Sequence, residues 1–287
     1  MRFVSFKKDG KNKLGVRTEA GLVDLSKIDR KLPTDLKELI AQGKGVLQRA
    51  GRAAKNAKPG AVVKGRVSYL TPIQNPDKIF CIGLNYKDHA AEAGLKIPTY
   101  PVVFTRFETS FVANGQALVR PKASKHFDYE AEMVAVIGKK ARNIKKSRAL
   151  EYVAGYSVAN EGSIRDYQMK ASQWTIGKNF DSTGSIGPDF VTADELPPGA
   201  KGLNVQCRLN GKVLQETNTR EMIFDVKTLV YELARAITLM PGDLILTGTG
   251  AGVGFVRKPP IFMKQGDICE IEIENVGLLS NPIRNEK

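Results

Sequence analysis

The sequence predicts an α+β protein: a small N-terminal α/β lobe over residues 1–70, then a larger strand-rich domain of mixed β-sheet over residues 71–287. Two observations support this fold class. Short apolar segments bounded by turn residues recur along the chain, as in proteins built mainly from strands. Helical periodicity is limited to a few short stretches, so helices should be sparse.

The first seventy residues combine strand patterns with helix patterns. Tight turns separate three strand patterns, and two helix patterns follow, at residues 2–6, 14–16, 21–25, 35–40 and 46–57. A proline-rich stretch at residues 71–76 then interrupts the chain. This lobe contains no recognisable chemical motif. We therefore expect it to pack on the larger domain without contributing chemistry.

A strand over residues 78–83 leads into a short helix that carries His89 and Glu92. Their i, i+3 spacing places the imidazole and the carboxylate on one helical face, where Glu92 can orient His89 and stabilise its protonated form. Such a pair can activate water. On spacing alone, an ordinary exposed His–Glu pair is the favoured interpretation.

Two glutamates precede a strand that should be buried on both faces. Glu130 and Glu132 share one face of an extended segment because side chains alternate with a period of two. The following residues, 133–137, are all apolar. Paired carboxylates repel unless a positive charge lies between them, and Mg²⁺ or Mn²⁺ prefers such oxygens. A solvated strand end is the alternative interpretation.

The next polar cluster contains Glu161, Arg165 and Gln168. If a helix begins after Asn160, these three side chains lie on one face, at i, i+4 and i+7. They would add a third carboxylate for a metal, and a guanidinium and an amide for an acidic substrate. Lys178, after a glycine-containing turn, could supply a second cation. The alternative for Arg165 is a surface salt bridge to Glu161.

The C-terminal third predicts further strands and one helix. Residues 203–214 form a hairpin pattern with an Asn-Gly turn, residues 225–239 an amphipathic helix, and residues 266–273 a half-exposed strand. The glycine-rich residues 244–254 match neither nucleotide-binding glycine motif. We expect this loop to bring Thr249 and backbone N–H groups close to a substrate carboxylate.

Composition limits the partners of this protein. The net charge of +14 raises nucleic acid as a partner, but the basic residues are scattered and no nucleic-acid-binding motif is present. Steering of an anionic substrate explains the charge at least as well, so we expect no nucleic-acid partner. No apolar run is long enough for a membrane span or signal peptide. The three cysteines are far apart in the sequence, which favours a cytoplasmic protein whose thiols stay reduced.

Taken together, six motifs resemble the fumarylacetoacetate hydrolase (FAH) family, in its branch of short-chain acylpyruvate hydrolases, 2-oxo-acid decarboxylases and isomerases. The resemblance implies an FAH-like β-roll catalytic domain over residues 71–287 and a homodimer. Where the family usually has Asn-Asp, this chain has Asn160-Glu161, so one metal ligand is a methylene longer. The motifs are residues 83–89 (GLNYKDH), 128–132 (DYEAE), 155–168, 173–178 (QWTIGK), 246–254 (LTGTGAGVG) and 258–260 (KPP).

The resemblance also implies an activity and a set of roles. The expected enzyme is a Mg²⁺- or Mn²⁺-dependent hydrolase that cleaves a C–C bond in a 2,4-dioxo acid, such as an acylpyruvate, through a metal-stabilised enolate. Two rivals remain: a 2-oxo-acid decarboxylase or tautomerase, which needs no water attack, and a catalytically weak metal- and anion-binding protein. The expected roles are metal binding by Glu130, Glu132 and Glu161, substrate binding by Arg165, Gln168, Lys178 and Thr249, and catalysis by His89, Glu92 and Lys178.

Overall fold

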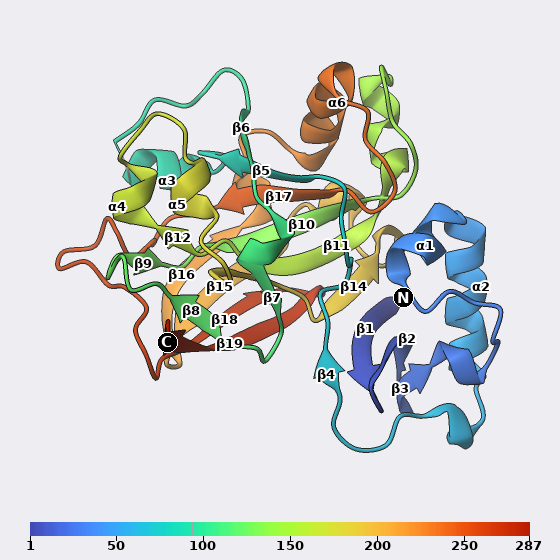
Figure 1. The fold of residues 1–287 in the computed structure, drawn as a ribbon. Helices are drawn as coiled ribbons and strands as arrows, with labels where there is room; N and C mark the ends of the chain where they lie inside the picture. Colours follow the sequence, from blue (N-terminus) through green and yellow to red (C-terminus); the bar gives the residue numbers. More distant parts are fainter. Residues whose placement is uncertain (93) are drawn as a thin grey trace.

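The computed structural model describes residues 1–92 and 94–287 (Figure 1). In this part of the chain, twelve strands form one large mixed sheet, whose main run has the order β3-β2-β1-β14-β11-β10-β17-β5-β6. Neighbours in this run are antiparallel except β17 and β5, which are parallel. Its strands are Gly21–Asp24 (β3), Lys11–Thr18 (β2), Arg2–Lys8 (β1), Asp189–Thr192 (β14), Val153–Asn160 (β11), Ala131–Ile137 (β10), Leu244–Thr249 (β17), Ile79–Gly83 (β5) and Val102–Thr105 (β6).

Smaller strands complete the architecture. Ser68–Tyr69 (β4) joins β1, Gly184–Ile186 (β13) joins β11, and Phe111–Ala113 (β7) joins β13. Phe127–Asp128 (β9) and Ser163–Ile164 (β12) form a two-stranded ladder. A five-stranded sheet has the order β16-β15-β18-β19-β8. Its strands are Lys212–Asn218 (β16), Asn204–Leu209 (β15), Ile268–Ile273 (β18), Gly277–Asn285 (β19) and Leu118–Arg120 (β8).

Helices are short and lie at the margins of the sheets (Figure 1). The α-helices are Leu36–Ala41 (α1), Lys44–Lys55 (α2), Lys87–Glu92 (α3), Arg165–Gln168 (α4), Thr175–Lys178 (α5) and Val226–Ala236 (α6). The 3₁₀ helices are Leu25–Lys27 (η1), Pro59–Ala61 (η2), Glu108–Ser110 (η3), Lys146–Tyr152 (η4), Ala193–Glu195 (η5), Pro198–Ala200 (η6) and Thr219–Glu221 (η7). None of the helices in the described residues has the length and apolar character needed to cross a membrane.

Two apolar cores cover opposite faces of the main sheet. One lies between the main sheet and the five-stranded sheet and includes Met133, Val158, Cys207 and Ile271, all nearly inaccessible to solvent. The other packs α1 and α2 of the N-terminal lobe against the sheet's opposite face. Strands β10 and β11 are therefore buried on both sides, which fixes the positions of the side chains at their ends.

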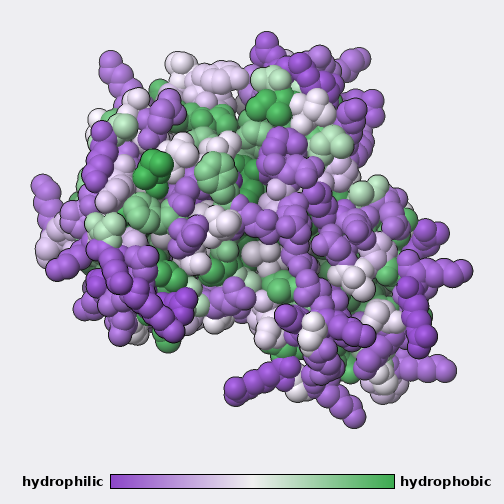
Figure 2. Space-filling view, viewed as in Figure 1, coloured by the Kyte–Doolittle hydropathy of each residue, from purple (hydrophilic) through white to green (hydrophobic). Residues whose placement is uncertain are grey.

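The N-terminal lobe extends the main sheet because β1 pairs with β14 in antiparallel register. Most of the lobe's surface is hydrophilic, at the lower right of Figure 2, whereas apolar residues gather on the upper face of the larger domain. We propose a boundary near residue 70. The chain leaves β4, beside β1, at that point and crosses to β5 on the far side of β10 and β17.

The predicted α+β class is confirmed, as are the N-terminal strands and helices, the helix carrying His89 and Glu92, and the Asn-Gly hairpin. The helix expected directly after Asn160 is wrong. The chain stays extended through β12, and α4 begins only at Arg165. Packing causes this: a Cβ on Gly162 would lie 1.9 Å from the Thr183 carbonyl oxygen, so the chain passes close to a neighbouring backbone here.

Candidate active site

Three glutamates meet at one end of the main sheet. Glu130 stands just before β10, Glu132 lies within it, and Glu161 follows β11. The antiparallel register pairs Ala131 with Asn160, so the end of β11 lies beside the start of β10. All three glutamates are buried, and one oxygen of each lies within 4.8 Å of the others. The cluster is therefore part of the protein interior, not a solvated strand end.

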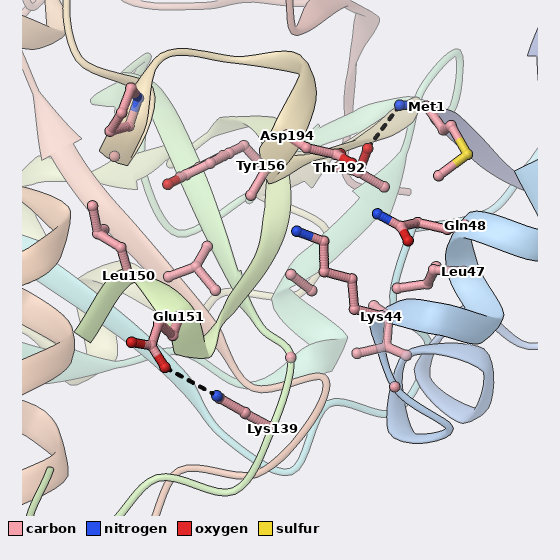
Figure 3. Close-up of a pocket in the computed structure, with 18 residues that line it drawn as sticks. Met1, Lys44, Leu47, Gln48, Lys139, Leu150, Glu151, Tyr156, Thr192 and Asp194 are labelled. Carbon is pink, nitrogen blue, oxygen red and sulfur yellow. Dashed lines mark hydrogen bonds and ion pairs between the residues drawn. The ribbon is translucent and has the colours of Figure 1, made fainter. Parts of the chain in front are cut away.

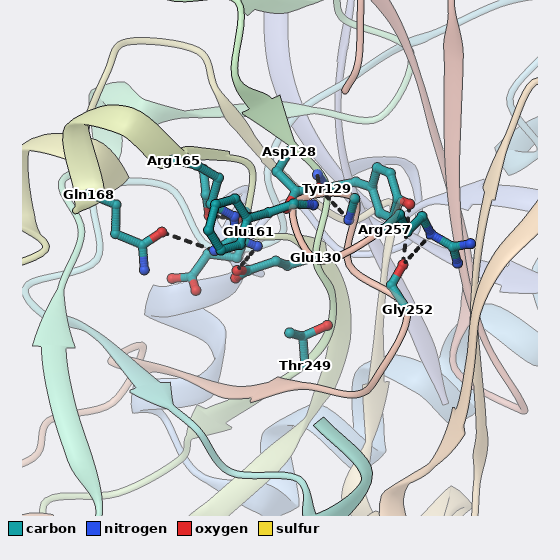
Figure 4. Close-up of polar contacts among 12 residues, drawn as sticks. Asp128, Tyr129, Glu130, Glu161, Arg165, Gln168, Thr249, Gly252 and Arg257 are labelled. Carbon is teal, nitrogen blue, oxygen red and sulfur yellow. Dashed lines mark hydrogen bonds and ion pairs between the residues drawn. The ribbon is translucent and has the colours of Figure 1, made fainter. Parts of the chain in front are cut away.

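Two buried cations, Lys178 and Arg165, offset part of this negative charge, and Figure 4 shows Arg165 among the acidic residues. Lys178, at the end of α5, donates through Nζ to Glu130 Oε2 at 2.7 Å and to Glu161 Oε2 at 2.9 Å. Arg165, at the start of α4, pairs through Nη2 with Glu130 Oε1 at 2.7 Å and donates from Nε to Asp128 Oδ2 at 2.8 Å. Burial alone would lower the pKa of Lys178, but the two glutamates raise it, so Lys178 stays protonated.

The three glutamates differ in how their oxygens are paired. Both oxygens of Glu130 face cations, and although burial opposes it, these cations hold the pKa of Glu130 well below its usual range. Glu132 accepts a hydrogen bond from Gly248 N at 2.8 Å. Burial first, and then the charges of Glu161 and Glu130, raise the pKa of Glu132 well above its usual value. Among the described residues, no cation pairs directly with Glu132.

The donor set fits a hard divalent cation. Glu161 Oε1 is buried and has no hydrogen-bond partner in the described residues, and Glu132 is bonded there only to a backbone N–H. Mg²⁺ and Mn²⁺ favour carboxylate oxygens, and either ion would relieve the repulsion that raises the pKa of Glu132. Glu130, Glu132 and Glu161 are thus the residues that would hold such an ion.

Arg165 and Gln168 lie one turn apart on α4, and Arg165 Nη1 donates to Gln168 Oε1 at 2.9 Å. The surface salt bridge to Glu161, considered as an alternative, does not form. Instead, Arg165 is only 8% exposed and its guanidinium is bonded to Asp128 and Glu130. Burial opposes the charge of Arg165, but these carboxylates raise its pKa further. Arg165 therefore orients Glu130, and its contact with a substrate stays a prediction.

Thr249 ends β17 directly opposite Glu132 in the β10–β17 ladder. Gln215 Nε2 donates to the Thr249 hydroxyl oxygen at 2.8 Å. Because a hydroxyl carries one proton and can also accept, the Thr249 O–H can donate to another acceptor. Gln215, on β16, also accepts from Ala131 N at 2.9 Å. One glutamine therefore positions both Thr249 and the start of β10.

In the glycine-rich loop after β17, several backbone N–H groups bind carboxylates of the protein itself. Gly254 N and Phe255 N donate to the two oxygens of Asp128 at 2.8 and 3.0 Å. Gly252 N donates to Glu92, at 3.0 Å to each carboxylate oxygen. The N–H groups of Gly252 and Gly254 are thus already bound within the protein, and those on Asp128 help this fully buried carboxylate to remain inside the protein.

His89 and Glu92 form the predicted pair on α3, with Nδ1 and Oε2 3.4 Å apart. Two contacts hold this helix. Asp88 accepts a hydrogen bond from the Thr217 hydroxyl at 2.6 Å, and the preceding Asn85 donates to the Thr247 carbonyl at 2.7 Å. With the Glu92 contact to the loop after β17, these bonds tether the His–Glu pair to the strand that carries Thr249.

Two buried charges near the cluster were not assigned roles from the sequence. Asp128 binds Arg165 and the loop after β17. Its spacing of two residues from Glu130 could have indicated that both side chains lie on the same face of the extended segment. Arg106, 2% exposed, donates to the Gly162 carbonyl at 3.1 Å and to the Thr183 hydroxyl at 3.0 Å. No motif marks Arg106. Arg106 lies between β6 and η3, 56 residues before Gly162 in the sequence, and its hydrogen bond to Gly162 fixes the backbone beside Glu161.

The raised pKa of Glu132 predicts a pH-dependent stability. The folded chain binds this proton more tightly than the unfolded chain, so the charged side chain destabilises the fold increasingly as pH rises above about 4.3. In EDTA, Glu132→Gln should therefore unfold at higher urea than the parent at pH 7–8. The difference should shrink toward pH 5, and each unit of raised pKa corresponds to about 1.4 kcal/mol.

Adding Mn²⁺ should reverse this order, because only the parent gains stability from a bound ion. Glu19→Gln, in an exposed turn, is the matched control and should follow the parent. A gap between Glu132→Gln and the parent that does not change with pH, or equal stabilisation of both by Mn²⁺, would contradict this account of the cluster.

Known proteins share this architecture. Residues 78–284 match the family model described as fumarylacetoacetate (FAA) hydrolase C-terminal. The chain is 39% identical to a Xenopus laevis protein named oxaloacetate tautomerase fahd2, mitochondrial, over 99% of this chain and 90% of that protein. Two solved structures align over the full length of both chains: a fumarylacetoacetate hydrolase from Exiguobacterium antarcticum (TM-score 0.85, 32% identity) and a 5-carboxymethyl-2-hydroxymuconate delta-isomerase from Mycobacterium smegmatis (TM-score 0.75, 27% identity). The chain therefore belongs to the fumarylacetoacetate hydrolase family.

Proposed function

We propose that this protein is a divalent-metal-dependent enzyme that interconverts the keto and enol forms of a 2-oxo dicarboxylic acid such as oxaloacetate. The buried cluster of Glu130, Glu132 and Glu161 beside Lys178 is the observation that carries this proposal. Several relatives that align over most of the chain are named oxaloacetate tautomerases, which favours tautomerisation over the hydrolysis expected from the motifs.

The three glutamates would hold Mg²⁺ or Mn²⁺. When bound, this ion would supply Lewis-acid chemistry to a 2-oxo carboxylate and so favour loss of the neighbouring C–H proton. Without this ion, the carboxylates of Asp128 and the three glutamates outnumber Lys178 and Arg165, the cations that pair with them in the described residues. An anionic substrate therefore requires additional positive charge before it can enter.

Three side chains retain donors for the substrate. Gln168 uses its oxygen to accept from Arg165, so its amide N–H groups are left to donate. The Thr249 hydroxyl accepts from Gln215 and can donate its own proton. Lys178 has three N–H donors, of which two bind glutamates. We propose that these donors bind the substrate carboxylate and the oxygen on which negative charge develops.

Tautomerisation moves one proton between C3 and the 2-oxo oxygen, and no bond between heavy atoms breaks. Lys178 is held protonated by its glutamate neighbours, so it would act as a donor to the oxygen rather than as the base. His89, oriented by Glu92, is the candidate group for moving the proton at C3.

Hydrolysis of a C–C bond in a 2,4-dioxo acid is the second candidate. The His89–Glu92 pair favours it, because a general base that activates water is needed for hydrolysis but not for tautomerisation. In that reaction, His89 would take a proton from water as the oxygen adds to the distal carbonyl, and cleavage would release a carboxylic acid and the enol of a 2-oxo acid.

The homodimer and the location stay proposals. Exposed apolar side chains between α3 and η3 offer a surface for a second copy, among them Leu95, Ile97, Tyr100 and Phe107. The three cysteines are buried and free of disulfides, in keeping with a reducing compartment such as the cytoplasm predicted from the sequence. The oxaloacetate tautomerases among the relatives carry the word mitochondrial in their names.

A substrate panel tests the proposed reaction. With Mn²⁺, the protein should interconvert enol and keto oxaloacetate faster than it hydrolyses acetylpyruvate, and exhaustive chelation should abolish both activities. His89→Ala should lower kcat for tautomerisation, and for any hydrolysis, by about 10²–10⁴, because the same imidazole would move the proton in either reaction. His126→Gln, which changes the other histidine, is the control and should retain activity.

Full activity after chelation would overturn the metal-dependent proposal. Faster hydrolysis than tautomerisation by the parent would instead select the second candidate. Metal binding without either activity would favour a catalytically weak metal- and anion-binding protein.

The longer side chain of Glu161 predicts a metal preference. Mg²⁺ demands nearly ideal octahedral geometry, whereas the larger Mn²⁺ tolerates a displaced oxygen. The parent should therefore prefer Mn²⁺ over Mg²⁺ in kcat/KM. Glu161→Asp should keep metal binding and shift the preference toward Mg²⁺, while Glu19→Asp should change neither. Equal metal preference in the parent and Glu161→Asp would show that the local backbone absorbs the extra methylene.

A further inference from the structure

A cavity lies at the ends of β10 and β11 that are remote from the glutamates (Figure 3). Its volume of about 510 Å³ falls within the range of small-molecule sites, roughly 300–1,000 Å³. Gly138, after β10, and Val153, at the start of β11, line it together with α2. Glu132 and Asn160 mark the opposite ends of the same strands. The cavity is therefore separate from the candidate active site.

The cavity wall contains a tyrosine, Tyr156, whose hydroxyl can donate a hydrogen bond. Leu47, Leu150 and Val153 make much of the wall apolar. Tyr156 adds its ring and is only 1% exposed, yet its hydroxyl makes no hydrogen bond to any described residue. Figure 3 shows this hydroxyl on the side of the cavity where Leu150 lies. Burial alone raises the pKa of Tyr156, so the group keeps its proton and can donate.

The cavity mouth carries one cation without a partner in the described part of the chain. Lys44, at the start of α2, makes no hydrogen bond or ion pair there, and Figure 3 shows its side chain extending from α2 into the space between the walls. The other charged side chains have partners. Lys139 pairs with Glu151 at 3.6 Å, and the Thr192 hydroxyl lowers the pKa of Asp194.

We propose that this cavity binds a small monocarboxylic acid with an apolar body and one hydrogen-bond acceptor at the end opposite the carboxylate. Lys44 binds the carboxylate at the mouth, Leu47 and Leu150 pack against the body, and Tyr156 donates to the acceptor. An apolar pocket with a few placed polar groups is the usual architecture of a small-molecule site.

The position of the cavity gives such a ligand two effects. Its walls come from both α2 and the main sheet, so a bound molecule would join the N-terminal lobe to the sheet and raise the melting temperature. Tyr156 also shares one face of β11 with Val158 and Asn160, and the Asn160 side chain accepts from Glu130 N at 3.1 Å. The ligand therefore contacts the row of side chains that ends at the glutamate cluster.

Three related probes test this proposal on the full chain in EDTA, which keeps metal-dependent binding out of the measurement. The probe 3-(4-methoxyphenyl)propanoate carries both the carboxylate and the acceptor. The analogue 3-phenylpropanoate lacks the acceptor, and 3-(4-methoxyphenyl)propan-1-ol lacks the charge. Calorimetry should give a Kd for the first probe about fivefold to tenfold lower than for either analogue, or roughly 1 kcal/mol.

Two conservative variants assign each preference to one side chain. Tyr156→Phe should remove the preference for the methoxy group, and Lys44→Met should remove the preference for the acid over the alcohol. Lys55→Met, on the same helix but outside the cavity, should keep both preferences. Failure of the first probe to bind the parent at millimolar concentration would overturn the proposal. Binding preferences that survive in both variants would overturn it as well, because the probe would then lie elsewhere.

Discussion

Repulsion among buried carboxylates is the constraint on which the site depends. Glu130, Glu132 and Glu161 lie within 4.8 Å of one another, where water cannot screen their charges. Lys178 bridges Glu130 and Glu161, whereas the one hydrogen-bond partner of Glu132 among the described residues is a backbone N–H. The cluster is stable when a proton or a cation adds positive charge. The repulsion that should make the metal-free protein sensitive to pH is also the basis of our proposal that the cluster binds a divalent ion.

The fold keeps these charges in place against their repulsion. Strands β10 and β11 are covered on both faces, so their ends cannot separate without opening an apolar core. Arg106 and the close approach of Gly162 to Thr183 fix the backbone that carries Glu161. A rigid scaffold of this kind can hold ligands before the ion and substrate arrive, which limits the reorganisation needed during the reaction.

Local pattern was sufficient to predict part of this arrangement. Strand alternation placed Glu130 and Glu132 together, and helical spacing placed His89 beside Glu92, because both patterns depend only on neighbours in sequence. Spacing failed for Glu161, since the chain remains extended until Arg165 under the packing of Gly162. The family motif remains the sequence feature that predicts metal binding by Glu161.

Other features depend on contacts between distant segments, which no local pattern encodes. Asp128 binds Arg165 across 37 residues and Gly254 across 126, and those partners decide which donors remain for a substrate. The cavity beside Tyr156 likewise needs α2 and β11 to meet. The sequence predicted the fold class because strand and helix patterns are local, but it could not predict which buried charges satisfy one another.

The most direct test of this account counts the protons released when Mn²⁺ binds. If Glu132 is protonated in the metal-free protein, calorimetric titration at pH 7 in buffers of different ionisation enthalpy should show about one proton released per ion bound. Glu132→Gln should lose both the binding and the release. Stoichiometric Mn²⁺ binding to the parent with no proton released would contradict the claim that carboxylate repulsion governs the site.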